Sequence, residues 1–326
     1  MVSTAQPHDI APTCWITWER HRRSRSLTQE LRIPLLEMSK PGGRTLRYFR
    51  DSLATLRRLV GRRHRTVFVQ VPSLVLGHLA ILSSALLRFR VVVDAHNAVI
   101  EGAERGRFPL RSLYRFVVRH ADLIVVTNSS LAQRVRRLGG RPGILPDPVP
   151  QMGPVPEAAS TGEVVVISTW ASDEPLDAIL AAAPRLPPGL SFVITGRPKG
   201  PLADVARRTE RVRLSGFVSE EEYISMLVRA RVVVDLTTRE DCLVCGAYEA
   251  LALGRPLVVS DSAALRELLR EGALFASNEP EAVVSAIAEA SADETKWAAR
   301  CAARRDAYVH EWRAAAEKLL SDIAAS

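Results

Sequence analysis

Cysteine, long apolar runs and export signals are scarce or missing in this sequence of 326 residues. Its four cysteines are too few for the disulfide framework of a secreted domain. The longest apolar run, residues 74–87, contains His78 and falls short of the roughly 18–20 residues that a membrane-spanning helix needs. The first residues, MVSTAQPHDIAPT, lack the basic start and apolar core of a signal peptide. We therefore expect a cytoplasmic protein.

Other absences exclude classes of function. No G-x-G-x-x-G follows any strand-like run, which argues against a nucleotide-dependent dehydrogenase. The arginines are not interleaved with aromatic residues and no known nucleic-acid motif occurs, so we expect no nucleic-acid partner. No DxD-like carboxylate motif for Mg²⁺ is evident, and we expect neither a metal nor a cofactor.

The length and the distribution of charge indicate two domains. A chain of this length exceeds one ordinary core, and two domains of roughly 150 residues are expected. Residues 1–150 carry a net charge of +15, whereas residues 151–326 carry −7. The basic half is expected to face something anionic. We place the domains at 1–150 and 151–305, with 306–326 a final helix that packs back across them.

Short apolar runs alternate with helical patterns along the chain, and this alternation predicts parallel sheets in an α/β fold. Ser219 and Glu222 form a capping-box pattern at the start of one helix. Prolines between 142 and 156 mark the linker between the domains. The expected strands are 13–18, 33–38, 66–71, 90–94, 123–127, 163–168, 192–195, the run RVRLS before Gly216, 232–236 and 256–260, and the expected helices include 19–31, 42–65, 74–87, 108–120, 129–138, 173–183, 263–270, 279–290 and 295–325.

Residues 231–261 form the most informative stretch, an apolar run, a polar turn, a helix that ends near Gly254 and a second β-branched run. Acidic residues lie at both ends of the loop-to-helix junction, at Asp241 and Glu249, with Gly246 between them. The N-terminus of a helix is a natural seat for a phosphate, because it offers free N–H groups and partial positive charge. Carboxylates nearby can accept hydrogen bonds from sugar hydroxyls.

This stretch resembles the signature of the retaining GT-B glycosyltransferases of family 4, in which an acid, seven residues and a Glu precede an aliphatic strand. The frame fits Asp241 and Glu249 here, although Glu240 with one extra residue of spacing is the alternative first acid. The resemblance implies two Rossmann-like domains with parallel sheets that face an interdomain cleft. It also implies a nucleotide-sugar donor held by residues of this stretch: Cys242, Leu243, Gly246 and Glu249. The competing interpretation is a buried helix with solvated acids at its start.

The resemblance carries over to further positions. Asp94-Ala95-His96-Asn97 follows a strand, where relatives contact the donor sugar, so His96 and Asp241 are candidate catalytic residues and Asn97 is a candidate donor contact. The turn Gly216-Phe217-Val218 resembles the loop that contacts the nucleotide base. Relatives place a basic residue after the first strand of the second domain, where it holds the donor diphosphate. The corresponding segment here, STWASDEP, contains no basic residue. Arg197 and Lys199 are therefore expected to hold the donor diphosphate.

Two basic features of the first half each leave two interpretations open. Arg20, His21, Arg22 and Arg23 crowd a strand-to-helix junction where relatives have a glycine-rich loop; they contact an anionic acceptor or form a solvated face. Helix 42–65 carries an apolar stripe surrounded by arginines, and it either lies on a membrane surface or packs on the sheet. The stripe consists of Leu46, Phe49, Leu53, Leu56 and Val60.

The interpretation that accounts for most of these features is a metal-independent hexosyltransferase that retains anomeric configuration and uses a nucleotide diphosphate sugar. Its acceptor is expected to be a glycan or polyprenyl-linked glycan in polysaccharide assembly, at the inner face of an anionic membrane. A nucleotide-sugar epimerase of GT-B type and a non-catalytic nucleotide-sugar-binding protein are the alternatives. The pair Cys242 and Cys245 is assigned to packing in preference to redox chemistry.

Overall fold

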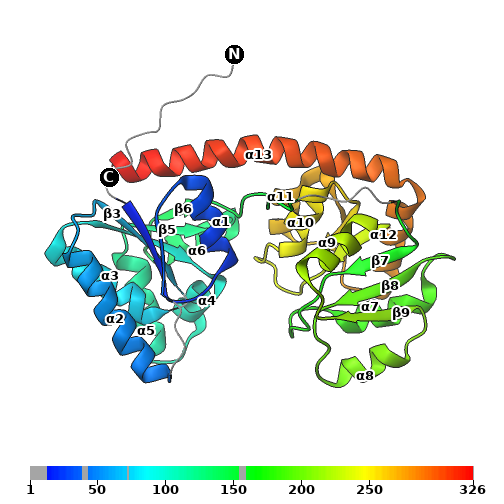
Figure 1. The fold of residues 1–326 in the computed structure, drawn as a ribbon, viewed down its shortest axis with the longest axis horizontal. Helices are drawn as coiled ribbons and strands as arrows, with labels where there is room; N and C mark the ends of the chain where they lie inside the picture. The colour runs from blue at the N-terminus through cyan, green and yellow to red at the C-terminus, as the bar shows by residue number, and fades with distance from the viewer. Residues whose placement is uncertain (1–12, 39–42, 72, 154–158, 326) are drawn as a thin grey trace, which may run out of the picture. The chain divides into compact units, whose positions relative to one another are not determined.

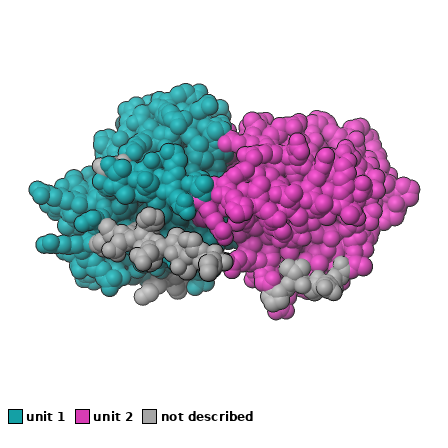
Figure 2. Space-filling view, turned by 90° about the horizontal axis from the view of Figure 1, so that it is seen from above, with its two compact units in different colours: residues 1–148, 314–326 teal, residues 149–313 magenta. Residues whose placement is uncertain are grey.

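The structure is a computed structural model that describes residues 13–38, 43–71, 73–153 and 159–325 (Figure 1). The chain divides into two compact units, coloured separately in Figure 2: residues 1–148 with 314–326, and residues 149–313. Each unit contains one six-stranded sheet in which all strand pairs are parallel. The expected α/β class with two parallel sheets is confirmed. The prolines at 154 and 156 of the expected linker, and most of the N-terminal MVSTAQPHDIAPT segment, lie outside the described residues.

The sheet of unit 1 has the order β2-β1-β3-β4-β5-β6. Its central strands are β-branched runs that are buried on both faces, as a parallel sheet covered by helices requires. The strands are β1 (Thr13–Thr17), β2 (Leu35–Glu37), β3 (Thr66–Val71), β4 (Arg90–Ala95), β5 (Leu123–Val126) and β6 (Pro142–Ile144), and the helices are α1 (Arg22–Leu31), α2 (Arg44–Val60), α3 (Leu74–Leu87), α4 (Asn97–Arg105), α5 (Leu110–His120) and α6 (Ser129–Arg137).

The sheet of unit 2 has the order β12-β11-β10-β7-β8-β9, so the winding reverses between β7 and β10. Helix α9 begins with the predicted capping box, in which the Ser219 hydroxyl accepts from the Glu222 N–H. The strands are β7 (Glu163–Val166), β8 (Ser191–Thr195), β9 (Val212–Gly216), β10 (Val232–Asp235), β11 (Leu257–Ser260) and β12 (Leu274–Ala276), and the helices are α7 (Leu176–Ala182), α8 (Pro201–Arg208), α9 (Glu220–Arg229), α10 (Cys245–Leu253), α11 (Ala263–Leu269), α12 (Pro280–Ala292) and α13 (Glu294–Ala325).

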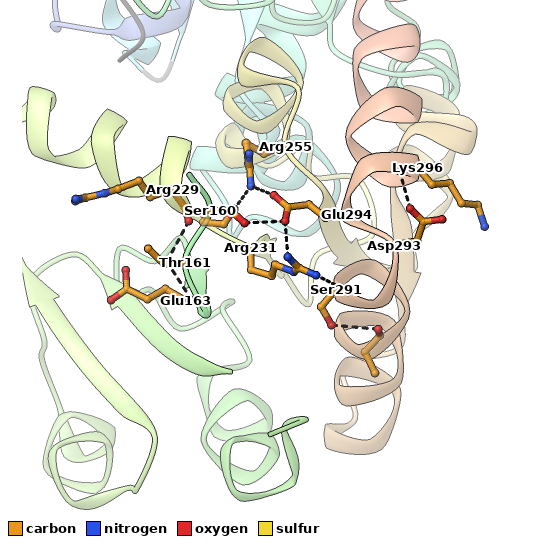
Figure 3. Close-up of polar contacts among 12 residues, drawn as sticks. Ser160, Thr161, Glu163, Arg229, Arg231, Arg255, Ser291, Asp293, Glu294 and Lys296 are labelled. Atoms are coloured by element: carbon orange, nitrogen blue, oxygen red, sulfur yellow. Dashed lines mark hydrogen bonds and ion pairs between the residues drawn. The ribbon is translucent and has the colours of Figure 1, made fainter. Parts of the chain in front are cut away.

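Helix α13 begins in unit 2 at a network around Glu294 (Figure 3). The Glu294 carboxylate accepts hydrogen bonds from Arg231 at 2.7 Å, from Arg255 at 2.5 Å and from the Ser160 hydroxyl at 2.7 Å. Two guanidinium groups around one largely buried carboxylate stabilise its charge. The first turn of the helix is thereby fixed to the end of α9 and to the segment before β7. Residues 314–325 of the same helix belong to unit 1.

Several boundaries differ from the expected ones. Helix α1 begins at Arg22 instead of residue 19, because His21 adopts the extended backbone of an N-cap. Helix α2 covers Arg44–Val60 within the expected 42–65, and residue 42 lies outside the described residues. Four short elements were not expected: α4, α8, β6 and β12. No helix of the described residues is both long and apolar enough to cross a bilayer.

Helix α2 turns its apolar stripe outward, so of the two interpretations of this stripe the one in which it packs on the sheet is wrong. Leu46, Phe49 and Val60 are 68%, 70% and 69% exposed. The buried face of the helix contains Asp51 and Thr55. Thr55 accepts a hydrogen bond from the indole N–H of Trp18 at 3.1 Å and donates to the Asp51 carbonyl at 2.7 Å. Asp51 and Thr55 therefore face inward together with Leu59, and the apolar side chains of Leu46, Phe49 and Val60 are left exposed.

Candidate functional site

Ligands of parallel α/β sheets bind beyond the carboxyl ends of the strands, close to the point where the winding reverses. In unit 2 this point lies between β7 and β10. The loops that follow β9, β8, β7 and β10 therefore lie next to one another along this edge. These are the loops in which the sequence placed the Gly216 turn, Arg197 and Lys199, STWASDEP and Asp241.

The loop after β7 is closed around a carboxylate of its own. Glu174 accepts hydrogen bonds from the backbone N–H groups of Thr169 and Trp170, both at 2.9 Å, and from the hydroxyls of Ser168 and Thr169 at 2.5 and 2.7 Å. Trp170 has a positive φ of 61° and is held by a bond from its indole N–H to the Thr195 carbonyl at 3.0 Å. The donors of this loop thus already hold an anion, and the loop itself contains no Lys or Arg.

Arg197 and Lys199 follow β8 and are exposed. Among the described residues neither forms an ion pair with an acid, and the Arg197 guanidinium lies 6.0 Å from the centre of the Phe217 ring, which is itself 83% exposed. Gly196 has a φ of +79°, and a Cβ there would meet the Ser168 carbonyl, so the turn lies directly against the loop after β7. Glycine at this position brings the cationic turn beside the end of β7. The structure therefore brings Arg197 together with Phe217 and leaves both accessible.

Helix α10 begins at Cys245 without a side-chain cap, because its N-cap residue is Val244. The second N–H of the helix, that of Gly246, donates to Asp235 Oδ2 at 2.8 Å. A Cβ at Gly246 would lie 2.5 Å from the same oxygen and would also meet Ile167. Gly246 therefore allows the helix to approach the end of β10, which sets the position of the N-terminus of α10.

Asp235, at the end of β10, was not singled out from the sequence. Burial raises the pKa of its carboxyl well above the ordinary value, and the carboxylates of Glu174, Glu249 and Asp173 raise it further, against the opposing hydrogen bond from Gly246. The acid at the end of the apolar run VVVD was the only available signal. This cluster makes the reversal point of unit 2 rich in acids.

Glu249 lies one turn into α10 and is only 3% exposed. Its carboxylate accepts a 2.5 Å hydrogen bond from the Tyr223 hydroxyl of α9. This bond fixes the carboxylate to the neighbouring helix. Glu249 is thus buried and held in place at the edge of the sheet. The competing interpretation, a buried helix with solvated acids at its start, therefore does not hold for this acid.

The loop between β10 and α10 holds the remaining candidates of the motif. It is anchored by the Asp173 carbonyl, which accepts from the Thr238 N–H at 2.7 Å. Asp241 and Leu243 are half-buried, whereas Glu240 is exposed. Neither Cys242 nor Cys245 forms a disulfide among the described residues, and Cys245 is exposed, so packing does not account for both cysteines. Val218, in the turn after β9, is half-buried.

The corresponding edge of unit 1 carries a pair of histidines. His96 follows β4 and is the N-cap of α4, where its Nδ1 accepts from the Ala98 N–H at 3.4 Å, and Asn97 is the first residue of that helix. His21 follows β1, and its ring lies edge-on to the His96 ring with the centroids 6.4 Å apart. The Nδ1 atom of His21 is buried and has no hydrogen-bond partner within the described ranges. The structure therefore brings His21 and His96 together.

Arg23 is held by acids of its own unit and is not part of a solvated basic face. Its guanidinium donates to Asp94 at 2.9 Å, to Asp147 at 2.6 Å and to the Leu145 carbonyl at 2.8 Å. The side chain is only 11% exposed. An arginine that satisfies two carboxylates and a carbonyl is part of the framework that joins α1, β4 and the end of β6. Arg20 and Arg22 are exposed, and Arg20 lies 3.6 Å from Glu37.

Comparisons with known proteins agree with this arrangement. The family model described as glycosyl transferase 4-like domain matches residues 9–145, and the model described as glycosyl transferases group 1 matches residues 155–293. A GDP-mannose-dependent alpha-(1-6)-phosphatidylinositol dimannoside mannosyltransferase of Mycobacterium tuberculosis is 30% identical over 138 residues. That stretch covers 41% of this chain and only 35% of the mycobacterial protein.

Solved structures extend the likeness of fold to nearly the whole chain. HepE of Anabaena in complex with UDP has a TM-score of 0.74 at 12% identity, over 97% of this chain and 100% of that chain. Sucrose-phosphate synthase from Thermosynechococcus elongatus has a TM-score of 0.73 at 15% identity, with the same coverage of both chains. The two family models, in tandem over both units, and the fold together show that the chain belongs to the GT-B glycosyltransferases of the family 4-like type.

Proposed function

We propose that this chain transfers a hexose from a nucleotide diphosphate sugar to a hydroxyl of a glycan or polyprenyl-linked acceptor, with retention and without a metal ion, in polysaccharide assembly at the inner face of a membrane. The observation that carries the donor half of the proposal lies within unit 2. There the N-terminus of α10, whose Gly246 N–H donates to the buried Asp235, the positioned Glu249 and the exposed pair Arg197 and Phe217 lie along one edge of the sheet.

Each part of this edge fits one part of a nucleotide sugar. Phe217 and Val218 offer an apolar surface to the base, and Glu249 accepts hydrogen bonds from ribose hydroxyls. Arg197 and Lys199 lie on one side of the end of β7, and the N-terminus of α10 lies on the other side. A diphosphate bound across the end of β7 contacts both, because charge-assisted donors and helix N–H groups both favour anions.

The proposed chemistry depends on holding the leaving group. Negative charge develops on the diphosphate as the glycosidic bond breaks, and fixed positive groups that meet this charge lower the barrier. Asp241 and the loop residues Cys242 and Leu243 are assigned to the transferred sugar, and His96 and Asn97 to the same sugar from unit 1. The orientation of donor and acceptor by these groups accounts for the rest of the rate enhancement.

The relatives suggest which ligands to test first. The mycobacterial relative uses GDP-mannose and acts on a phosphatidylinositol dimannoside, and HepE of Anabaena binds UDP and UDP-glucose. A glycolipid acceptor with an anionic head group is consistent with the net charge of +15 on residues 1–150. GDP- and UDP-sugars with lipid-linked acceptors are therefore the first set.

The test is a panel of nucleotide sugars, screened first by thermal shift and then for release of nucleoside diphosphate with a mixed glycolipid acceptor fraction. We expect one sugar to stabilise the protein, release of its diphosphate only with acceptor, an unchanged anomeric configuration by NMR and full activity with EDTA. An isomerised nucleotide sugar would instead indicate the epimerase. Binding without turnover on any acceptor would indicate a non-catalytic binding protein.

A further inference from the structure

Exposed apolar side chains lie not only on α2 but also on two neighbouring helices. On α3, Leu82 and Leu86 are 64% and 82% exposed, and around the start of α5, Phe108 is 81% exposed. Helix α2 packs against α3, and α3 packs against α5 (Figure 1). Buried residues of all three helices belong to one core cluster with one face of the sheet, so the three helices form a single layer. The outer apolar face comprises Leu46, Phe49, Leu53, Val60, Leu82, Leu86, Phe108, Leu110 and Leu113.

A surface of this kind is unusual on a monomeric soluble unit. Single exposed apolar side chains are common, whereas a set that follows one face of three adjacent helices indicates an interaction surface. On α2 the exposed residues recur at intervals of three, four and seven, so they form one stripe along the helix. The core residue Leu59 and the buried Asp51 and Thr55 occupy the opposite face.

The charge around this face has one sign. Residues 43–90 contain ten arginines and a single acid, Asp51, which is buried. Arg57, Arg62 and Arg63 are exposed, and among the described residues they have no acidic partner. At 100° per residue, Arg57 and Arg50 lie beside the apolar stripe of α2. Exposed apolar side chains are thus bordered by arginines, of which Arg50 pairs with Asp51 at 3.3 Å and Arg57 has no acidic partner among the described residues.

We propose that this outer apolar face docks on the surface of an anionic lipid bilayer, with its apolar side chains among the acyl chains and its arginines at the lipid phosphates. This pairing of apolar and cationic groups is that of an interfacial helix. A second copy of the chain is a poor occupant, because its own arginines would repel those of the first copy. Nucleic acid would leave the exposed leucines and phenylalanines without a partner. The proposal is independent of sugar transfer, because it concerns the side of unit 1 formed by α2, α3 and α5.

The experiment is co-sedimentation of the full chain with vesicles of phosphatidylcholine alone and of an equal mixture with phosphatidylglycerol. It is run at about 0.1 M and about 1 M salt, where the Debye length falls from about 10 Å to about 3 Å. We expect binding to the anionic vesicles at low salt and its loss at high salt. Removal of two arginines by Arg57→Gln and Arg63→Gln should weaken binding about twentyfold or more, at roughly fivefold for each arginine.

The apolar contribution is tested by Leu46→Ser with Phe49→Ser, which should weaken binding about tenfold or more, because two exposed apolar side chains no longer enter the bilayer. The matched controls are Val205→Ser, at a residue that is 43% exposed on α8 of unit 2, and Arg208→Gln on the same helix; both should bind as the parent does. Circular dichroism and nucleotide-induced thermal shift should stay unchanged in all variants. Equal binding to neutral vesicles would overturn the proposal, and so would double variants that remain folded and bind as the parent does. The proposal also fails if the parent pellets without vesicles and the variants do not, because the face would then mediate self-association.

Discussion

The carboxyl edges of the two sheets use charge in opposite ways. In unit 1 the cation Arg23 is enclosed by its own acids, Asp94 and Asp147, and the edge presents histidines. In unit 2 the acid Glu174 is enclosed by hydroxyls and backbone N–H groups, and the edge presents the cations of the turn after β8. A parallel α/β sheet therefore places ligand groups at the same edge in both units, and a few loop residues decide which sign of charge is already satisfied.

This difference separates residues that hold the loops from residues that are accessible to a ligand. A charged side chain enclosed by the chain contributes to stability, whereas an exposed one at the same edge contributes to ligand binding. Substitutions at the two edges should therefore change different measurements. The largest expected effect is on stability in unit 1, and the smaller effects are on ligand affinity in unit 2.

Arg23→Ala should destabilise unit 1 by about 3–5 kcal/mol, because it leaves Asp94 buried without its cation. The measurement is denaturant unfolding of the full chain followed by hydrogen exchange in β4. Arg20→Ala is the matched control, since the Arg20 side chain is 74% exposed and, among the described residues, its ion pair is with the rim acid Glu37 at 3.6 Å. It should change stability by less than about 0.5 kcal/mol. If both variants change the free energy of unfolding by similarly small amounts, Arg23 is accessible to a ligand and is not part of the framework.

The positions of most helices and strands could be predicted because their patterns are local. The β-branched run of β3 and the apolar helix α3 were expected with the bounds 66–71 and 74–87, which the structure has. Helix α8 was missed because it is short and begins with Pro201 directly after a Gly/Pro turn. Strands β6 and β12 have three residues each, too few to show a period.

The contacts of the charged residues could not be predicted, because they join distant parts of the chain. Arg23 pairs with Asp147, 124 positions away, and Glu249 with Tyr223, 26 positions away. The apolar period of α2 predicted a helix correctly, yet it did not show which face is buried. The choice of the buried face depends on Trp18, because its buried indole N–H requires an acceptor and donates to the Thr55 hydroxyl. Family resemblance supplied the candidate residues, and only the fold showed which of them are already paired.

Glu249→Gln should weaken binding of the bare nucleoside diphosphate by about 1.5–3 kcal/mol, because a charged acceptor of ribose hydroxyls is lost while the side chain keeps its volume. Isothermal calorimetry measures this directly. Tyr223→Phe removes only the 2.5 Å bond that positions the carboxylate and should have a smaller effect in the same direction. If Glu249→Gln binds nucleotide as the parent does while remaining folded, Glu249 is an internal structural acid, like the enclosed acids of unit 1.

Arg197→Ala should weaken nucleoside diphosphate binding roughly tenfold, because one charge-assisted contact to the diphosphate is lost. Thermal stability should stay unchanged, since Arg197 makes no ion pair among the described residues. Arg208→Ala, at a residue of α8 that is also exposed, controls for the net charge of the unit. A loss of affinity shared by both variants would indicate a general field effect and would remove the special role of the turn after β8.

The smallest effect is expected where two adjacent acids compete for one role. Asp241 is half-buried in the turn at 239–242, whereas Glu240 is exposed and forms no hydrogen bond or ion pair among the described residues. An acid that binds a sugar must be held in place, because an exposed flexible side chain loses conformational entropy on binding.

We therefore expect Asp241→Asn to weaken binding of the full nucleotide sugar about threefold to tenfold. The same variant should leave the bare diphosphate unaffected, because the sugar is the only part of the ligand that Asp241 is assigned to contact. Glu240→Gln should change neither affinity by more than about twofold. Calorimetry with both ligands on both variants decides the matter. A stronger effect at Glu240 would shift the motif by one residue and make exposure a poor guide to function at this edge.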